Sequence, residues 1–165
     1  MSNRAAQPGS IMLALVLGAC YQPPTETQLI RSFTSHRTAY DKLATMAVAD
    51  RKFSRVAAGE IAPSGMPESR FNEYQAIFHE LGIETSMNWG IPSYPAGLFI
   101  VISSCIPLGG KGQAVGYAYL PTAPDAIEKQ LSISGCPIQI HSARGHRIVF
   151  RPLQDRWYLF YFLEW

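Results

Sequence analysis

The spacing of the apolar residues changes at Gly82. Before this residue, apolar side chains recur at every third or fourth position, and after it they alternate with other side chains or form continuous runs. The first spacing is typical of amphipathic helices and the second of β-strands. Because helices that precede strands do not alternate with them, the pattern predicts an α+β fold and disfavours a doubly wound parallel sheet. We expect N-terminal helices packed on one face of a mainly antiparallel sheet of about four or five strands.

Two helices are expected in the first half of the chain. The first is an amphipathic helix of about six turns that begins at a capping box formed by Thr25 and Gln28. The second begins near Glu68 and ends at Gly82, which is placed to adopt a left-handed cap. Residues 57–67 contain two glycines and two prolines and are expected to form a loop. The apolar stripes of the two helices are Leu29, Phe33, His36, Tyr40, Leu43 and Ala47, and then Phe71, Tyr74, Phe78 and Leu81.

Strands are expected after Gly82. Their ranges are Thr85–Trp89, Leu98–Ile102, Ala114–Tyr119, Arg147–Arg151 and Trp157–Leu163. The second range has no polar face, so we expect a central strand that is covered on both sides. The third has one face of small residues, which would let a helix approach closely. Residues 124–131 are expected to form a short helix or an irregular crossing.

The last two strand ranges are separated only by residues 152–155 and are expected to form a hairpin. In the range that begins at Trp157, apolar side chains occupy both faces. This pattern predicts a strand in the interior of the sheet or one that the first helix covers.

The first twenty residues indicate where the protein is located. A short polar start that contains Arg4 is followed by an apolar run, residues 11–17, and by the small residues Gly18 and Ala19. A finished membrane-spanning helix needs about 20 apolar residues, whereas the apolar region of a signal peptide needs only about 7–15. The pattern therefore predicts a signal peptide. The alternative is a buried N-terminal helix in which Cys20 is an ordinary apolar residue.

The segment Leu17-Gly18-Ala19-Cys20 resembles the lipobox of bacterial lipoproteins. The resemblance implies that signal peptidase II removes residues 1–19 and that Cys20 becomes the N-terminus, with a diacylglycerol group on its sulfur and acyl chains such as palmitate as the membrane anchor. Residues 20–25 would be the lipidated cysteine and a short spacer, and residues 26–165 a single periplasmic α+β domain. Two acyl chains on one cysteine provide stable anchoring without a membrane-spanning helix.

The residue after the cysteine bears on which membrane holds the anchor. In lipoproteins of this type an Asp at that position favours the inner membrane, so Tyr21 implies the outer membrane, with the domain facing the periplasm. The lipobox, the helix pattern of Leu29–Arg37 and the strand pattern of Trp157–Tyr161 together resemble small proteobacterial lipoproteins of unassigned function.

Three cysteines occur in the chain, and Cys105 and Cys136 remain if Cys20 carries lipid. Two thiols in an oxidising compartment can pair. A disulfide that closes about 30 residues would stabilise the fold by about 3 kcal/mol in the chain-entropy model. The alternative is two separately buried thiols.

No motif for catalysis, for a cofactor or for a metal ion is found in the sequence. The glycine-rich residues 108–112 differ from a phosphate loop, because Cys105 replaces its first glycine and Gly112 replaces the residue that holds Mg²⁺. A His-Glu pair at residues 79–80 begins like a zinc-protease helix, but Ile83 replaces the second histidine. The common nucleophile motifs are absent. We therefore expect a protein that is not an enzyme and has no cofactor.

The charge of the chain disfavours nucleic acid as a partner. Its formal value is +2, and removing residues 1–19, whose only charged side chain is Arg4, leaves +1. This charge provides no broad basic field for a phosphate backbone. A local cationic cluster in a predicted loop can contact lipid phosphates or an anionic partner, and the alternative is a solvated loop. Its members are His141, Arg144, His146 and Arg147.

Three functions are compatible with these features. The leading hypothesis is an outer-membrane lipoprotein whose periplasmic domain binds a protein or an envelope component without catalysis. The second is a periplasmic inhibitor or immunity-type protein that presents an exposed loop to an enzyme cleft. The third is a hydrolase built from dispersed residues such as His36, His141 and His146. A concave pocket with convergent polar side chains would favour the hydrolase, and a flat apolar patch would favour binding.

Overall fold

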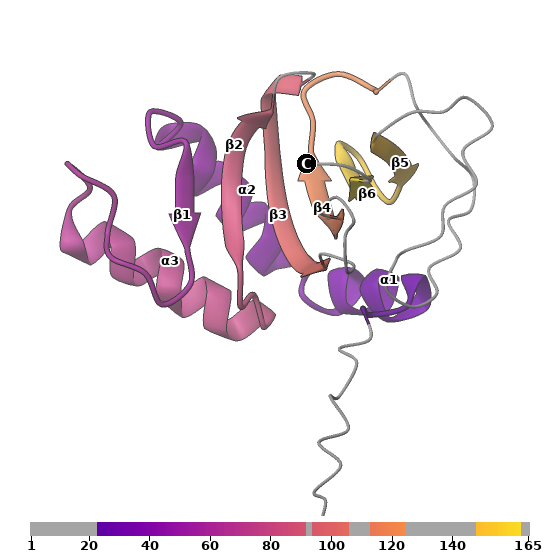
Figure 1. Cartoon of the computed structure of the whole chain (residues 1–165), viewed down its shortest axis with the longest axis horizontal. Helices are drawn as coiled ribbons and strands as arrows, with labels where there is room; N and C mark the ends of the chain where they lie inside the picture. Colours follow the sequence, from indigo (N-terminus) through magenta and orange to yellow (C-terminus); the bar gives the residue numbers. More distant parts are fainter. Residues whose placement is uncertain (1–22, 92–93, 106–112, 125–147, 163–165) are drawn as a thin grey trace, which may run out of the picture.

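The structure is a computed structural model that describes residues 23–91, 94–105, 113–124 and 148–162. The described helices are α1 (Glu26–Ser35), α2 (Arg37–Ala49) and α3 (Glu68–Leu81). The described strands are β1 (Arg55–Ala57), β2 (Ser86–Ile91), β3 (Tyr94–Cys105), β4 (Gln113–Tyr119), β5 (Ile148–Pro152) and β6 (Trp157–Phe162). They form one open antiparallel sheet in the order β1-β2-β3-β4-β6-β5 (Figure 1). The α+β class and the antiparallel sheet are confirmed, and the expected strand count is wrong, because the described residues form six strands.

The additional strand, β1, is only three residues long, and its last residue, Ala57, is the first residue of the predicted loop 57–67. Its backbone groups find partners far away in the sequence. The side-chain amide of Gln75 in α3 donates to the carbonyl oxygen of Ala57 at 2.9 Å and accepts from the N–H of Gly59 at 2.9 Å. A strand this short shows no readable alternation of side chains. Its pairing with β2 and its contact with α3 therefore could not be predicted from its own residues.

The expected helix of about six turns is instead two helices that meet at His36. This residue is the C-cap of α1 and the N-cap of α2, with φ −119° and ψ 25°, which are not helical values. The carbonyl oxygen of Ser32 accepts the backbone N–H of His36 at 3.1 Å, and the Nδ1 atom of the same histidine lies 3.0 Å away from it. The non-helical backbone at His36 ends α1, so the prediction of one helix of about six turns is wrong.

The predicted ends of the helical region are confirmed. Thr25 and Gln28 form a complete capping box at the start of α1. At the end of α3, Gly82 adopts φ 63°, and the N–H of Ile83 donates to the carbonyl oxygen of Phe78 at 2.8 Å. A left-handed residue followed by this hydrogen bond is the usual glycine-terminated helix end.

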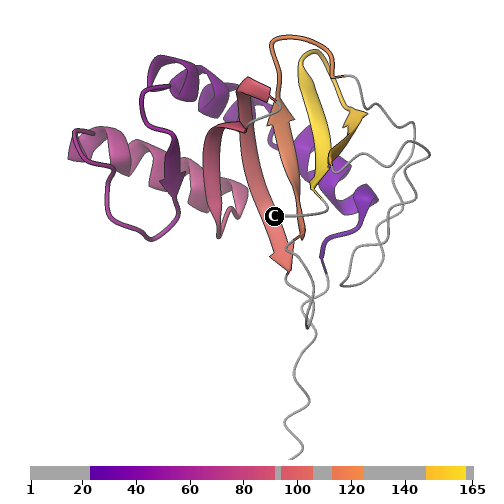
Figure 2. The same ribbon diagram turned by 45° about the horizontal axis from the view of Figure 1, so that its top comes forward.

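Buried side chains form two clusters on the two sides of the sheet. All buried helical side chains belong to the first cluster, together with Leu98 and Ile100 of β3. Phe99 and Val101, which point to the other side of β3, belong to the second cluster. This arrangement confirms that β3 is a central strand with both faces buried. β6 lies between β4 and β5, so the prediction of an interior strand is also confirmed (Figure 2).

One expectation about β4 is wrong. We expected its face of small residues to admit a helix, but Ala114 and Ala118 belong to the cluster that contains no helical side chain. The large residues Val115 and Tyr117 share their cluster with the helices, and the hydroxyl group of Tyr117 donates to the carbonyl oxygen of Leu29 in α1 at 2.8 Å. The helices therefore contact the large face of this strand.

The predicted hairpin of the last two strands is confirmed for β5 and β6, which pair from Ile148↔Phe162 to Pro152↔Tyr158. Asp155 in the connecting turn has φ 53°, a left-handed value that Asp tolerates better than most residues. Three expectations lie partly or wholly outside the described residues: Arg147 and Leu163 at the strand ends, and the element at 124–131, of which only residue 124 is described.

The strand register defines two ends of the sheet. β3 ends where β4 begins, at the pair Cys105↔Gln113, and Ala114↔Phe162 lies next to it, so we name this the Cys105 end. The opposite end contains the pair Tyr119↔Trp157, and we name it the Trp157 end. In Figures 1 and 2 the chain enters α1 beside the arrowhead of β3, at the Cys105 end.

Candidate functional site

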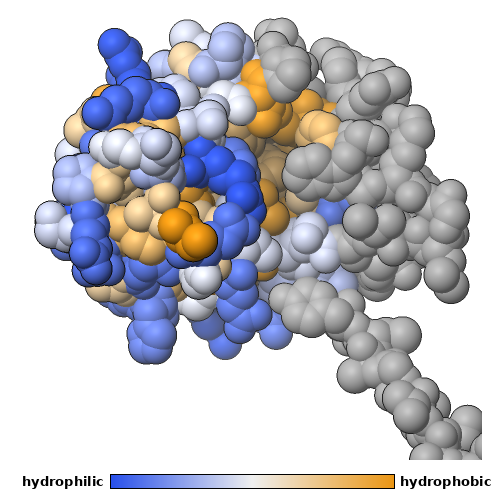
Figure 3. Space-filling model, turned by 60° about the vertical axis from the view of Figure 1, so that its left-hand side comes forward, coloured by the Kyte–Doolittle hydropathy of each residue, from blue (hydrophilic) through white to orange (hydrophobic). Residues whose placement is uncertain are grey.

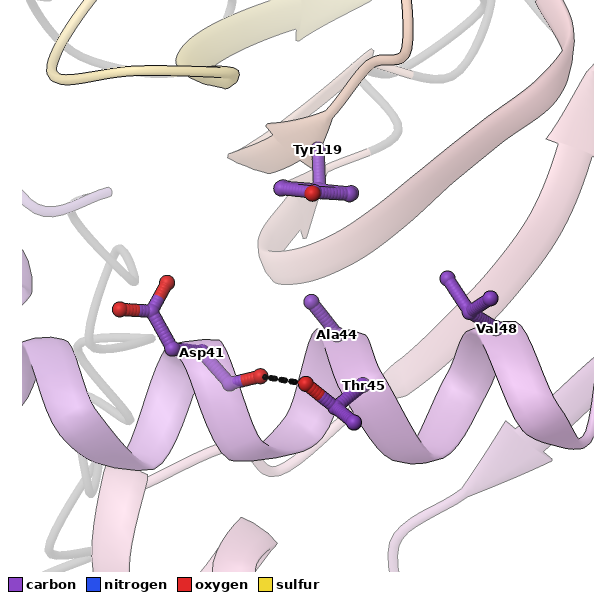
Figure 4. Close-up of a pocket in the computed structure, with 5 residues that line it drawn as sticks. All are labelled: Asp41, Ala44, Thr45, Val48 and Tyr119. Atoms are coloured by element: carbon purple, nitrogen blue, oxygen red, sulfur yellow. Dashed lines mark hydrogen bonds between the residues drawn. The ribbon is translucent and has the colours of Figure 1, made fainter.

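A groove of about 390 Å³ lies between α2 and the end of β4, at the Trp157 end of the sheet. Figure 4 shows Asp41, Ala44 and Val48 pointing from α2 toward the ring of Tyr119. The spacing of these helical residues by three and four positions places them on one face of α2. Thr45 completes the lining, and its hydroxyl donates to the backbone carbonyl of Asp41 at 2.9 Å. We call this the α2 groove.

The carboxylate of Asp41 connects the α2 groove to the core. One of its oxygens accepts a hydrogen bond from the indole Nε1–H of Trp157 at 2.9 Å. The other accepts from Nε of Arg37, one helical turn earlier, also at 2.9 Å. Each oxygen therefore has a donor that holds it in place.

Arg37 extends this network to the turn between β5 and β6. Its Nη2 donates to a carboxylate oxygen of Asp155 at 2.8 Å, and its guanidinium lies 5.2 Å from the centre of the Phe33 ring. Burial alone would lower the pKa of Arg37, but the hydrogen bonds to Asp155 and Asp41 outweigh burial and raise it. This arginine is therefore a fixed positive charge that joins α2 to the last hairpin.

The lining of the α2 groove combines apolar, aromatic and acidic side chains. Asp41 is the one carboxylate among the described residues that line it, and both of its oxygens already accept hydrogen bonds. Among the residues that the structure describes, the lining includes no histidine, cysteine or lysine that could serve as a base or a nucleophile. Val48 is 47% exposed, so the groove has an accessible apolar end.

A second hollow, of about 560 Å³, lies at the Cys105 end. It is formed where the start of α1, the end of α3 and β3 come together. Its lining includes Pro23, Gln28, Glu84 and Ile102. Glu84 and Gln28 are exposed, and Pro23 is buried.

A second polar cluster ties the end of α2 to α3. One carboxylate oxygen of Asp50 accepts from Nε of Arg70 at 2.6 Å and from the hydroxyl of Tyr74 at 2.9 Å. Nη1 of Arg70 donates to Glu73 at 2.7 Å. The two hydrogen bonds to Asp50 make this cluster a structural link between the end of α2 and α3.

Most of the predicted site residues lie outside the described part of the chain. These are Cys20, Cys136, His141, Arg144, His146 and Arg147. Cys105 is the last residue of β3. His36 is exposed at the junction of α1 and α2, where its ring lies against a backbone carbonyl, and the described residues bring no second histidine to it.

The described residues also contain no group of three or more His, Cys, Asp or Glu side chains placed to hold a metal ion. None of the helices in the described ranges is long and apolar enough to cross a membrane. Figure 3 turns the side with β1 and α3 toward the viewer and shows a small apolar area surrounded by hydrophilic residues. Ile61, in the loop between β1 and α3, is 94% exposed, and a single exposed apolar residue of this kind is common on protein surfaces.

Comparison with known proteins found no relative: no protein-family model, no curated protein and no solved structure matches the chain significantly.

The sequence reasoning missed the α2 groove. The spacing of Arg37 and Asp41 is that of an ion pair on one helix face and could have indicated their contact. Asp155 and Trp157 reach the same place from more than 110 positions away in the sequence. Nothing in their local pattern indicates this partner.

Proposed function

We propose that this protein is a bacterial lipoprotein, anchored in the outer membrane through Cys20, whose periplasmic domain binds a protein or an envelope component without catalysis. The observation that carries the anchor is the lipobox-like segment Leu17–Cys20, which four residues separate in the sequence from the capping box that opens α1.

The binding role rests on the α2 groove. It combines an accessible apolar side chain, Val48, with an aromatic ring, Tyr119, and a carboxylate that the fold holds in place. Interfaces of proteins commonly combine an aromatic or apolar centre with a polar rim. The groove is also at the Trp157 end, away from the chain segment that leads to Cys20.

We also propose that the helices cover one face of the sheet. The buried side chains of all three helices belong to the same core cluster, the one that contains Leu98 and Ile100, and this supports the proposal. In this arrangement α2 lies against the sheet, and its residues Asp41, Ala44 and Val48 face Tyr119 of β4 across the α2 groove.

Replacing the anchor cysteine tests the first part of the proposal. We expect Cys20→Ala to abolish incorporation of labelled palmitate and to move the protein from the membrane fraction to the soluble fraction or leave it unprocessed. The reason is that the diacylglycerol group is attached to the thiol of Cys20, which alanine lacks. Fractionation and intact mass measure the result. An unchanged mass in an unchanged membrane fraction would refute the lipid anchor.

A matched variant keeps the cysteine and changes its neighbour. We expect Tyr21→Asp to retain palmitate but to redistribute the protein to the inner membrane, because the resemblance assigns the choice of membrane to this position. Retention in the outer membrane would refute the sorting interpretation and leave the anchor itself in place.

Two exposed apolar residues allow a test of the binding site. We expect Val48→Lys to lower the amount of partner that the detergent-solubilised protein recovers from envelopes by at least about tenfold, which corresponds to about 1.4 kcal/mol. Ile61→Lys makes the same chemical change outside the groove and is expected to recover the wild-type amount. Equal recovery by both variants, measured by quantitative mass spectrometry against a tag-only control, would exclude the α2 groove as the binding site.

A further inference from the structure

The position of the anchor constrains the orientation of the domain, provided that the proposed lipidation of Cys20 is correct. Pro23 is buried in the domain, and the next residues are fixed by the capping box, in which Gln28 Oε1 accepts the N–H of Thr25 at 2.7 Å. The folded domain therefore holds the chain from Pro23 onward. In the sequence only residues 21 and 22 separate Pro23 from Cys20, and we call this short segment the tether.

This tether is short compared with the thickness of the lipid headgroup layer. Three residues of fully extended chain span at most about 11 Å. The headgroup layer on each side of a bilayer is about 5–8 Å thick. The point where Pro23 enters the domain therefore lies within or just above the headgroups. No other protein helix, with a diameter of about 10–12 Å, fits between this point and the lipid.

We propose that the Cys105 end of the domain is a membrane-contact surface that lies against the phospholipid headgroups of the leaflet that holds the anchor. The hollow lined by Pro23, Gln28 and Glu84 is part of this surface. The exposed side chains among the described residues of this hollow, such as Gln28 and Glu84, are polar, which suits contact with headgroups rather than insertion into hydrocarbon. Glu84 offers a carboxylate to the ammonium group of phosphatidylethanolamine.

The same orientation places the α2 groove away from the membrane. β3 runs from Leu98, which pairs with Tyr119 near the groove, to Cys105 at the membrane-contact surface. A strand rises about 3.3 Å per residue, so the two ends of this segment are separated by about 23 Å. The groove is then accessible to a periplasmic partner while the domain rests on the leaflet.

The orientation is tested with the full-length lipidated protein in vesicles of phosphatidylethanolamine and phosphatidylglycerol. A small fluorescent amino acid is introduced at position 84 or at position 154, where the wild-type residues Glu84 and Gln154 are both exposed. Residue 154 lies in the turn between β5 and β6 at the Trp157 end. A nitroxide on the lipid headgroups should quench the reporter at position 84 several-fold more than the reporter at position 154.

A longer tether provides the control. Inserting 20 Gly and Ser residues after Tyr21 adds an r.m.s. reach of about 25 Å and should remove most of the difference between the two reporters. Vesicle flotation is measured first. Flotation with equal quenching at both positions would overturn the orientation and leave the anchor intact. Failure of the wild-type protein to float, or flotation of Cys20→Ala, would overturn both proposals.

Discussion

Gly116→Ala is expected to lower the free energy of unfolding by about 3 kcal/mol, at the upper end of the range for overpacking. A Cβ atom at this position in β4 would overlap the backbone carbonyl oxygen of Ile100 and would lie 3.1 Å from the backbone nitrogen of Ile102. Both atoms belong to the central strand β3, so no side-chain rotation can relieve the overlap. The strands must separate, which breaks hydrogen bonds in the middle of the sheet.

The close approach has a local cause in the pairing of β3 with β4. The register passes from Val101↔Gly116 to Ser103↔Val115, so Ile102 is an extra residue in β3. Such a bulge bends its strand and leaves one residue unpaired. In this protein the bulge brings the backbone of β3 against Gly116, where only a residue without a side chain fits.

Gly65→Ala is the matched control for this prediction. Gly65 has φ 82°, and a Cβ there would meet nothing within 4 Å. Its replacement should therefore cost only the conformational strain of about 1–2 kcal/mol. Urea unfolding followed by circular dichroism measures both variants. A loss of stability in Gly116→Ala no larger than that in Gly65→Ala would contradict the expected backbone clash.

The sequence predicted those parts of the fold that depend on neighbours in the chain. The capping box at Thr25, the left-handed cap at Gly82 and the final hairpin were correct, because each depends on a few consecutive residues. The break at His36 was missed, since the apolar stripe continues across it at helical spacing. Periodicity reports which side of a helix is buried and does not report where its axis changes direction.

At Gly116 the sequence pattern of small residues is real, but its predicted explanation is wrong. The small residues on one face of β4 were interpreted as room for a helix, but the space at Gly116 is taken by the backbone of β3. The small residues of one strand indicate that another part of the backbone approaches that strand closely. They do not show whether that neighbour is a helix over the face or a bulged strand beside it.

The candidate binding site was less predictable than the fold. Its helical half follows from the three- and four-residue spacing of α2, but the ring of Tyr119 comes from β4 and the indole of Trp157 from β6. These residues meet because the sheet order brings β4 and β6 together. A local pattern cannot specify that order, and the site could be found only in three dimensions.

Trp157→Ala is expected to destabilise the protein by about 3–5 kcal/mol. The indole is fully buried and lies 5.5 Å from the ring of Phe33, 5.7 Å from that of Tyr40 and 5.2 Å from that of Tyr119, measured between ring centres. Its removal leaves a cavity among rigid aromatic neighbours that cannot close it completely. Urea unfolding measures the loss. Val48→Ala, at the exposed end of the α2 groove, is the control and should change the free energy of unfolding by no more than about 0.5 kcal/mol.

A double-mutant cycle separates the hydrogen bond of Trp157 from its packing. Trp157→Phe keeps an aromatic ring and removes the N–H that Asp41 accepts, while Asp41→Ala removes the acceptor. We expect a coupling energy of about 1–2 kcal/mol, because a charged acceptor strengthens the bond and the partial exposure of Asp41 weakens it. A coupling near zero would show that the core does not hold this carboxylate. The α2 groove would then have a mobile rim, and its charge could not orient a partner.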